Sequence, residues 1–190
     1  MIRAMMLLWL AQNPVLRLPS EAPPMEEAGP ANLDFETGDA GEVPPEWSLT
    51  QASRVAGYRV ELRREGCRSG SGCAVISSSP KLEKGAAGGL IQQFPAVRYH
   101  GQLMRLRVWV KLQGQQRGDG VRVAFTTDGE GGGDSTYIQK GGRVTASEWT
   151  MAEVEGKVPW RAELIHLVVS VQGKGGFWID DVSFEEVGAR

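Results

Sequence analysis

The sequence holds few of the residues that enzymes use for chemistry. Its 190 residues include only two His, His100 and His166, and two Cys. No G-x-S-x-G, H-E-x-x-H, Walker or dinucleotide-binding motif occurs, and neither Cys sits in a nucleophile signature. The adjacent carboxylates Glu185 and Glu186 would point to opposite faces of a strand and could not share a substrate. We therefore expect a protein that binds and does not catalyse a reaction.

The sequence also lacks an excess of charge and a long apolar run. Its 21 Lys and Arg nearly balance its 23 Asp and Glu, which gives a net charge of −2 and a pI near 5.8. This balance argues against nucleic-acid binding through overall basicity. The apolar run Ala4–Ala11 has eight residues, and no other run approaches the length that spans a bilayer. We expect no nucleic-acid partner and no membrane span.

The first eleven residues have the order of a short export signal. Arg3 precedes the apolar run, but Trp9 stands where such signals carry a small residue before the cleavage site. Two interpretations stay open. A short or truncated signal over residues 1–11 implies an extracellular or periplasmic protein, whereas a mis-assigned start implies a cytoplasmic one.

Glycine and proline are the abundant residues, at 25 and 10. Five of the prolines lie between residues 12 and 31, where they block both helix and sheet hydrogen bonding. We interpret 12–31 as a Pro-rich linker and 32–187 as one folded domain. That length suffices for a single hydrophobic core.

Inside this domain the apolar residues recur with a period of two. Every second residue from Leu106 to Leu112 is apolar, and the residues that alternate with them are Arg105, Arg107, Trp109 and Lys111. Segments 121–126 and 165–172 alternate in the same way. Further strand-like runs lie at 58–64, 73–78, 90–94, 136–140, 149–158 and 177–185. About ten short strands around one core predict an all-β, two-sheet β-sandwich of the jelly-roll type.

Six short motifs, in order along the domain, resemble those of galactose-binding-like jelly rolls. That group includes carbohydrate-binding modules of the family 4, 9 and 22 type. Uncharacterised bacterial versions stand beside hydrolase domains, including peptidases, or occur alone. The motifs are Asn32–Gly38 (NLDFETG), Pro45–Trp47 (PEW), Gly66–Ile76 (GCRSGSGCAVI), Arg107–Lys111 (RVWVK), Ser147–Thr150 (SEWT) and Phe177–Val182 (FWIDDV).

The resemblance implies a structural Ca²⁺ between the first and last strands. Its ligands would be the carboxylates of Glu36 and Asp180, with backbone carbonyls near residues 68–70. A hard cation takes six to eight such oxygens. The alternative is that Asp180 and Asp181 end a strand and hydrogen-bond a neighbouring turn.

A sugar-binding face is the main functional hypothesis. Arg105, Arg107, Trp109 and Lys111 share one side of their strand, and a Trp among basic groups suits a glycan, including an acidic one. If neighbouring strands face the same way, the polar residues around them are Arg122, Thr126, His166, Ser170 and Gln172. The alternative is a solvated sheet face with a scaffold Trp.

Other tryptophans offer a second hypothesis for a ligand site. Trp47 and Trp160 lie close to prolines, which places them at loop tips as additional ligand candidates. Trp149 and Trp178 are expected to be packed.

Cys67 and Cys73 flank a tight turn and are close enough in sequence to form a disulfide. A disulfide would agree with export, and two free thiols are the alternative. Zinc would need two further ligands, and neither His lies near in sequence.

Together these features predict a non-catalytic glycan-binding module that is exported and monomeric, with an oligo- or polysaccharide as its partner. The alternative is a protein-interaction or scaffold domain that assists a separate hydrolase or peptidase. An uncharacterised hydrolase is a third interpretation.

Overall fold

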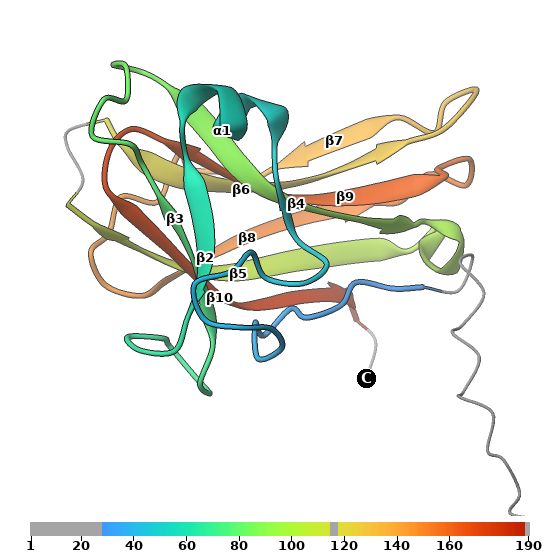
Figure 1. Ribbon diagram of the computed structural model, residues 1–190. Helices are drawn as coiled ribbons and strands as arrows, with labels where there is room; N and C mark the ends of the chain where they lie inside the picture. Colours follow the sequence, from blue (N-terminus) through green and yellow to red (C-terminus); the bar gives the residue numbers. More distant parts are fainter. Residues whose placement is uncertain (1–27, 115–117, 189–190) are drawn as a thin grey trace, which may run out of the picture.

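The computed structural model describes residues 28–114 and 118–188 of the chain. The candidate signal and most of the Pro-rich segment lie outside the described residues, so the division into 1–11, 12–31 and 32–187 stays a prediction. The elements are β1 (Ser48–Leu49), α1 (Gln51–Ala56), β2 (Arg59–Arg63), β3 (Cys73–Ser77), β4 (Ala87–Pro95), η2 (Val97–Tyr99), β5 (Leu103–Gln113), β6 (Gly120–Asp128), β7 (Ser135–Ile138), β8 (Thr150–Lys157), β9 (Leu164–Gln172) and β10 (Gly176–Glu186). Figure 1 shows the strands lying in layers, with α1 at the top of the view.

The two layers are five-stranded sheets in which every neighbouring pair is antiparallel. We call the sheet with strand order β1-β4-β9-β6-β7 sheet I, and the sheet with order β2-β3-β10-β5-β8 sheet II. Strands that follow each other in the chain, such as β5 and β6, often lie in different sheets, as in a jelly roll. The expected two-sheet β-sandwich is confirmed.

The core lies between the sheets and is built from the residues that the period of two assigns to it. On β5 the buried residues are Met104, Leu106, Val108, Val110 and Leu112, and on β9 they are Ile165, Leu167, Val169 and Val171. Side chains from both sheets belong to one continuous hydrophobic cluster. The residues between them are therefore left on the two outer faces of the sandwich.

A bulge in strand β10 reverses which of its alternate side chains face the core. Between Asp180 and Ser183 its pairing with β5 slips by one residue, and Asp181 takes a φ of 44°. Such a bulge adds one residue to a strand and reverses the alternation beyond it. Trp178 therefore faces outward before the bulge, while Phe184 joins the core cluster after it.

Helix α1 has six residues, too few to show a helical stripe in the sequence. Its ends carry ordinary signals, because the Thr50 hydroxyl accepts from the Ser53 N–H and Gly57 closes the helix in the left-handed region. Within 28–114 and 118–188, no helix combines the length and apolar character that crossing a membrane requires.

The contact of α1 with sheet I predicts the effect of one substitution. Ser53 is fully buried, and its hydroxyl contacts both the N–H and the carbonyl of Gly89 on β4. In Ser53→Ala the buried Gly89 N–H loses its partner, so we expect the free energy of unfolding to fall by about 1–3 kcal/mol. Urea denaturation measures this loss. The matched control, Ser147→Ala at an exposed serine, should change stability by less than about 0.5 kcal/mol.

Candidate functional site

The four residues expected to form a sugar face do share a surface, the outer face of sheet II. They are Arg105, Arg107, Trp109 and Lys111. The Nε of Arg105 lies 2.7 Å from Glu155 on β8, which raises the pKa of this guanidinium. Arg107 contacts Glu153 of β8 at 2.7 Å and Glu185 of β10 at 2.6 Å. Carboxylates on the two neighbouring strands therefore pair both arginines.

Cationic side chains of the same chain lie over the aromatic rings of this face. The Arg68 guanidinium lies 3.8 Å from the centre of the Trp109 ring. The Lys111 Nζ lies 4.7 Å from the Trp149 ring and 4.6 Å from the Trp178 ring. Trp149 and Trp178, expected to be packed, are thus half-exposed partners of Lys111 on the outer surface. Cation–π contacts of this kind stabilise the face itself.

The residues expected to surround Trp109 lie on the other side of the molecule. His166, Arg122, Thr126, Ser170 and Gln172 come from β9 and β6, which belong to sheet I. The outer faces of the two sheets point in opposite directions (Figure 1). The expectation of one shared surface is therefore wrong, because the chain crosses between the sheets after β5.

The outer face of sheet I is instead organised in rows across four strands. Strand register places Gln93, His166, Thr126 and Thr136 in one row, Ile91, Val168, Ala124 and Ile138 in the next, and Gly89, Ser170 and Arg122 in the third. We call these the polar row, the apolar row and the arginine row. His166 contacts Asp128 at 3.1 Å. Within the described chain, the side chains of Gln93, Thr126 and Ser170 have no hydrogen-bond partner.

Of the two loop tryptophans, one is buried and one is exposed. Trp47 is only 4% exposed, packs against Phe35 and donates its indole N–H to the Asn32 carbonyl at 3.0 Å. The expectation that Trp47 lies at a loop tip for a ligand is wrong, because the turn after Pro44 directs the ring into the core. Trp160 is 73% exposed and lies beside His100, so it stays a candidate.

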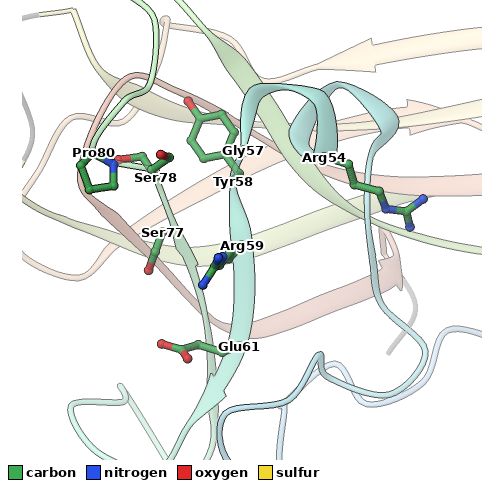
Figure 2. Close-up of a pocket in the computed structure, with 9 residues that line it drawn as sticks. Arg54, Gly57, Tyr58, Arg59, Glu61, Ser77, Ser78 and Pro80 are labelled. Atoms are coloured by element: carbon green, nitrogen blue, oxygen red, sulfur yellow. The ribbon is translucent and has the colours of Figure 1, made fainter.

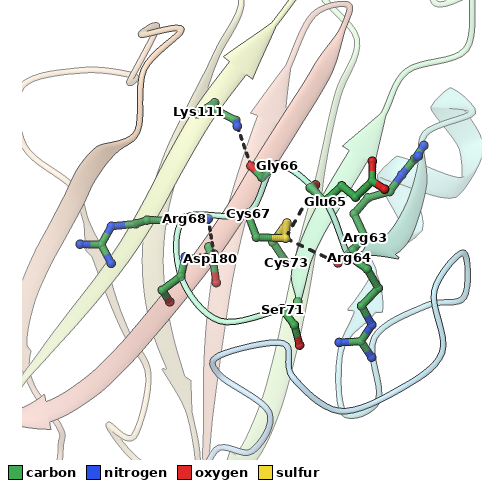
Figure 3. The surroundings of a disulfide bond; sticks show 12 residues. Arg63, Arg64, Glu65, Gly66, Cys67, Arg68, Ser71, Cys73, Lys111 and Asp180 are labelled. Carbon is green, nitrogen blue, oxygen red and sulfur yellow. Dashed lines mark hydrogen bonds between the residues drawn. A yellow bond between two sulfur atoms is a disulfide. The ribbon is translucent and has the colours of Figure 1, made fainter.

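Cys67 and Cys73 are joined by a disulfide (Figure 3), which closes what we call the disulfide loop, residues 67–73. Within the described residues no free cysteine remains. The loop lies on the outer face of sheet II, where Lys111 donates to the Gly66 carbonyl at 2.7 Å. Arg68 reaches both the Trp109 ring and the carboxylate of Asp181.

Glu36 and Asp180 bind the two halves of the disulfide loop. Glu36 accepts from the N–H groups of Ser71 and Gly72 at 2.8 and 2.9 Å, and from the Ser71 hydroxyl at 2.6 Å. Asp180 accepts from the N–H groups of Arg68 and Ser69 at 2.8 and 3.2 Å. The loop thus connects the segment before β1 to the last strand.

The two carboxylates differ in electrostatics. Hydrogen bonds from the Ser71 hydroxyl and N–H lower the pKa of Glu36. Asp180 is fully buried beneath the loop, and this burial raises its pKa although three backbone N–H groups act against the shift.

This donor set does not fit the Ca²⁺ that the resemblance implies. A cation needs oxygens turned toward it, but here backbone N–H groups point at both carboxylates. Arg64 adds a positive charge near Glu36. In the described part of the chain, no three His, Cys, Asp or Glu side chains are placed to hold a metal ion. The arrangement matches the alternative, in which the carboxylates hydrogen-bond a turn.

A pocket of about 740 Å³ opens at the β2 edge of sheet II, next to the end of α1 (Figure 2). Arg59 and Ser77 lie opposite each other on β2 and β3 and line it. Glu61 also lines the pocket but pairs with Arg63, and the Tyr58 hydroxyl donates to the Gly173 carbonyl at 2.8 Å. None of the ligand residues expected from the sequence lies in this pocket.

Comparison with known protein sequences gives a distant relationship to a bacterial regulator. No family model matches the chain. The uncharacterized HTH-type transcriptional regulator YbfP of Bacillus subtilis (strain 168) is 24% identical over 141 residues, which are 74% of this chain and 48% of the regulator. The chain therefore spans about half the length of this curated relative.

Solved structures of carbohydrate-binding modules superpose on most of the chain. A Clostridium thermocellum xylanase 10B fragment, CBM22-1 with its GH10 module and xylohexaose, has a TM-score of 0.60 at 18% identity over 79% of this chain and 28% of that one. The CBM22-1 xylan-binding domain of Paenibacillus barcinonensis Xyn10C has 0.59 at 14%, over 83% and 93%. TmCBM61 with β-1,4-galactotriose has 0.54 at 20%, over 83% and 97%. The chain has the galactose-binding-like jelly-roll fold of these modules.

Because backbone N–H groups surround Glu36 and Asp180, we expect the stability of the disulfide loop to depend on the disulfide and not on Ca²⁺. We expect the melting temperature to be equal in EDTA and in millimolar Ca²⁺, and to fall when the disulfide is reduced, because closing so short a loop contributes roughly 2 kcal/mol. Scanning calorimetry with and without reductant measures both effects. The Cys67→Ser, Cys73→Ser double variant should not respond to reductant. A higher melting temperature in Ca²⁺ would contradict the fit described above.

The lowered pKa of Glu36 predicts a loss of stability in acid. A carboxylate whose pKa is depressed in the folded state contributes stability above its ordinary pKa of 4.5, and this contribution disappears as the pH falls through the folded value. We expect Glu36→Gln to lose less stability than the wild type below that pH. Asp180 has the opposite sign and is kept in both proteins.

Urea denaturation between neutral pH and pH 3 compares the two slopes. Glu148→Gln, at an exposed residue, is the matched control and should follow the wild type. Equal slopes for Glu36→Gln and the wild type would show that the Glu36 contacts do not form.

Proposed function

We propose that this chain is a non-catalytic glycan-binding module that holds an oligo- or polysaccharide on the outer face of sheet I. The observation that carries the proposal is the order of rows on that face. An apolar row lies between two rows with hydrogen-bonding groups, on a fold shared with modules described as xylan-binding or bound to galactotriose.

A pyranose ring matches this order of rows. Its C–H face can pack on Val168, Ala124 and Ile138, while its hydroxyls reach the polar groups on either side. Residues two apart on a strand are separated by roughly 7 Å, so adjacent rows lie within reach of one sugar ring. The three rows carry no Phe, Tyr or Trp ring, and the aliphatic row takes the place that stacking on such rings has in other sugar sites.

The two outer faces differ in what remains free to bind. On sheet II, Arg105, Arg107 and Lys111 already contact carboxylates or rings, and a sugar would have to displace these contacts. On sheet I, the unpaired groups of Gln93, Thr126 and Ser170 can exchange water for sugar hydroxyls without breaking a protein contact. The exposed Trp160 offers a further stacking surface at the end of β8.

Export is part of the same proposal. The disulfide supports an extracellular or periplasmic location, because disulfides persist in oxidising compartments. The protein would act as a monomer there.

The second candidate is a protein-interaction module, accessory to a separate hydrolase or peptidase. It is favoured by α1, where Val55 is 84% exposed beside a pocket of about 710 Å³ lined by Ala52, Ala56 and Lys81. The likeness to half of a larger regulator also favours a module that works with other domains.

Glycan titrations test the proposal and the face together. We expect a neutral oligosaccharide, xylohexaose or β-1,4-galactotriose, to bind in calorimetry or affinity electrophoresis. His166→Ala should weaken that binding roughly tenfold, the effect of one lost hydrogen bond of about 1.4 kcal/mol. Met151→Ala is the control, since Met151 is exposed on sheet II opposite Trp109.

Two results would contradict parts of the proposal. If Trp109→Ala abolished binding and His166→Ala had no effect, the glycan would occupy sheet II. If neutral and acidic glycans all failed to bind, the glycan function would be wrong and the interaction role would replace it.

A further inference from the structure

Two arginines lie next to each other on the outer face of sheet I. Val121 of β6 and Val144 exchange two backbone hydrogen bonds, of 2.9 and 2.7 Å, so these two residues are directly opposite. Both valines belong to or pack against the core. Because alternate residues face opposite sides, Arg122 and Arg143 flank this pair on the outer side.

Gly120 shows where the Arg143 side chain runs. A Cβ at Gly120 would lie 2.7 Å from the Arg143 Cβ and 3.2 Å from its Cδ. Gly120 is two residues before Arg122 on the same strand, so such a Cβ would project from the outer face. The stem of Arg143 therefore crosses this face over a position that only glycine leaves open.

The two charges lack an acidic partner among the described residues. Neither Arg122 nor Arg143 forms an ion pair in the described chain, and the Arg122 Nε is buried without a hydrogen-bond partner. The nearest acid in sequence, Asp119, accepts from the Lys174 N–H. Like charges opposite each other destabilise a sheet, and a buried unpaired donor adds to that cost.

Sheet II shows how the same protein treats arginines that serve structure. Arg105 and Arg107 are also neighbours on one strand, but three glutamates on β8 and β10 neutralise them. The described part of sheet I offers its arginines no such carboxylate. An unneutralised pair is better explained by an anion that binds from outside than by stability.

We propose that Arg122 and Arg143 bind the carboxylate of an acidic sugar, a uronic acid residue of the glycan. The inference rests on the proposed function and names its substrate class. Ser170 lies opposite Arg122 and Gln172 opposite Gly120, so a hydroxyl and an amide flank the carboxylate position for the ring hydroxyls of the same residue. Guanidinium groups match planar carboxylates with paired hydrogen bonds.

The test compares an acidic with a neutral ligand on the full chain. The probes are oligogalacturonate, its carboxyl-reduced form and xylohexaose. We expect oligogalacturonate to bind at least tenfold more tightly than its reduced form, with an affinity that falls as salt rises. The Arg122→Gln, Arg143→Gln double variant should lose this tenfold preference and keep its affinity for the reduced form within twofold.

The control is Arg54→Gln, which removes an exposed arginine from α1 and should leave the preference intact. The melting temperature of the double variant should equal or exceed that of the wild type, since a repulsive pair has been removed.

The outcomes separate this inference from the proposed function. Equal binding of the acidic and reduced oligosaccharides, or a preference that survives in the double variant, would overturn the acidic-sugar site and leave glycan binding standing. If none of the three probes bound to any of the proteins, the glycan function itself would be rejected.

Discussion

Burial of every second residue between two sheets is the constraint on which the rest of this structure depends. Once Leu106 and Val108 face the core, Arg105 and Arg107 must face outward. The sheet that a strand joins then decides which outward residues can meet. The sandwich therefore has two outer faces. They differ in their contacts because different strands lie beside the outward residues of each sheet.

One outer face is closed by contacts within the protein and the other is open. On sheet II, glutamates pair the arginines, and cations cover the Trp rings beside the disulfide loop. On sheet I, the polar row and the arginine row contain groups that have no hydrogen-bond partner in the described chain. The buried Arg122 Nε is the clearest example. Polar groups that are paired within the protein, as on sheet II, stabilise the fold. Polar groups without a protein partner, as on sheet I, remain available to a ligand.

The sequence was sufficient for the strands and the sandwich, because alternation such as that of β5 is a local property of the chain. It was insufficient for the site, because the pairing of β6 with β9 and of β5 with β10 depends on which strands cross between layers. The bulge at Asp181 and the buried position of Trp47 arise from contacts far apart in the chain. Arg143 lies in no regular strand, and its place beside Arg122 follows from the bridge that its neighbour Val144 forms with Val121 of β6.

The hydrogen bonds of Glu36 and Asp180 also change how the disulfide loop exchanges hydrogen with water. The amide hydrogens of an irregular surface turn normally exchange fast, as those of an unfolded chain do. Four successive or nearly successive amides here, at Arg68, Ser69, Ser71 and Gly72, are covered by carboxylates. Their deuterium uptake therefore reports when the disulfide loop separates from the segment before β1 or from the last strand.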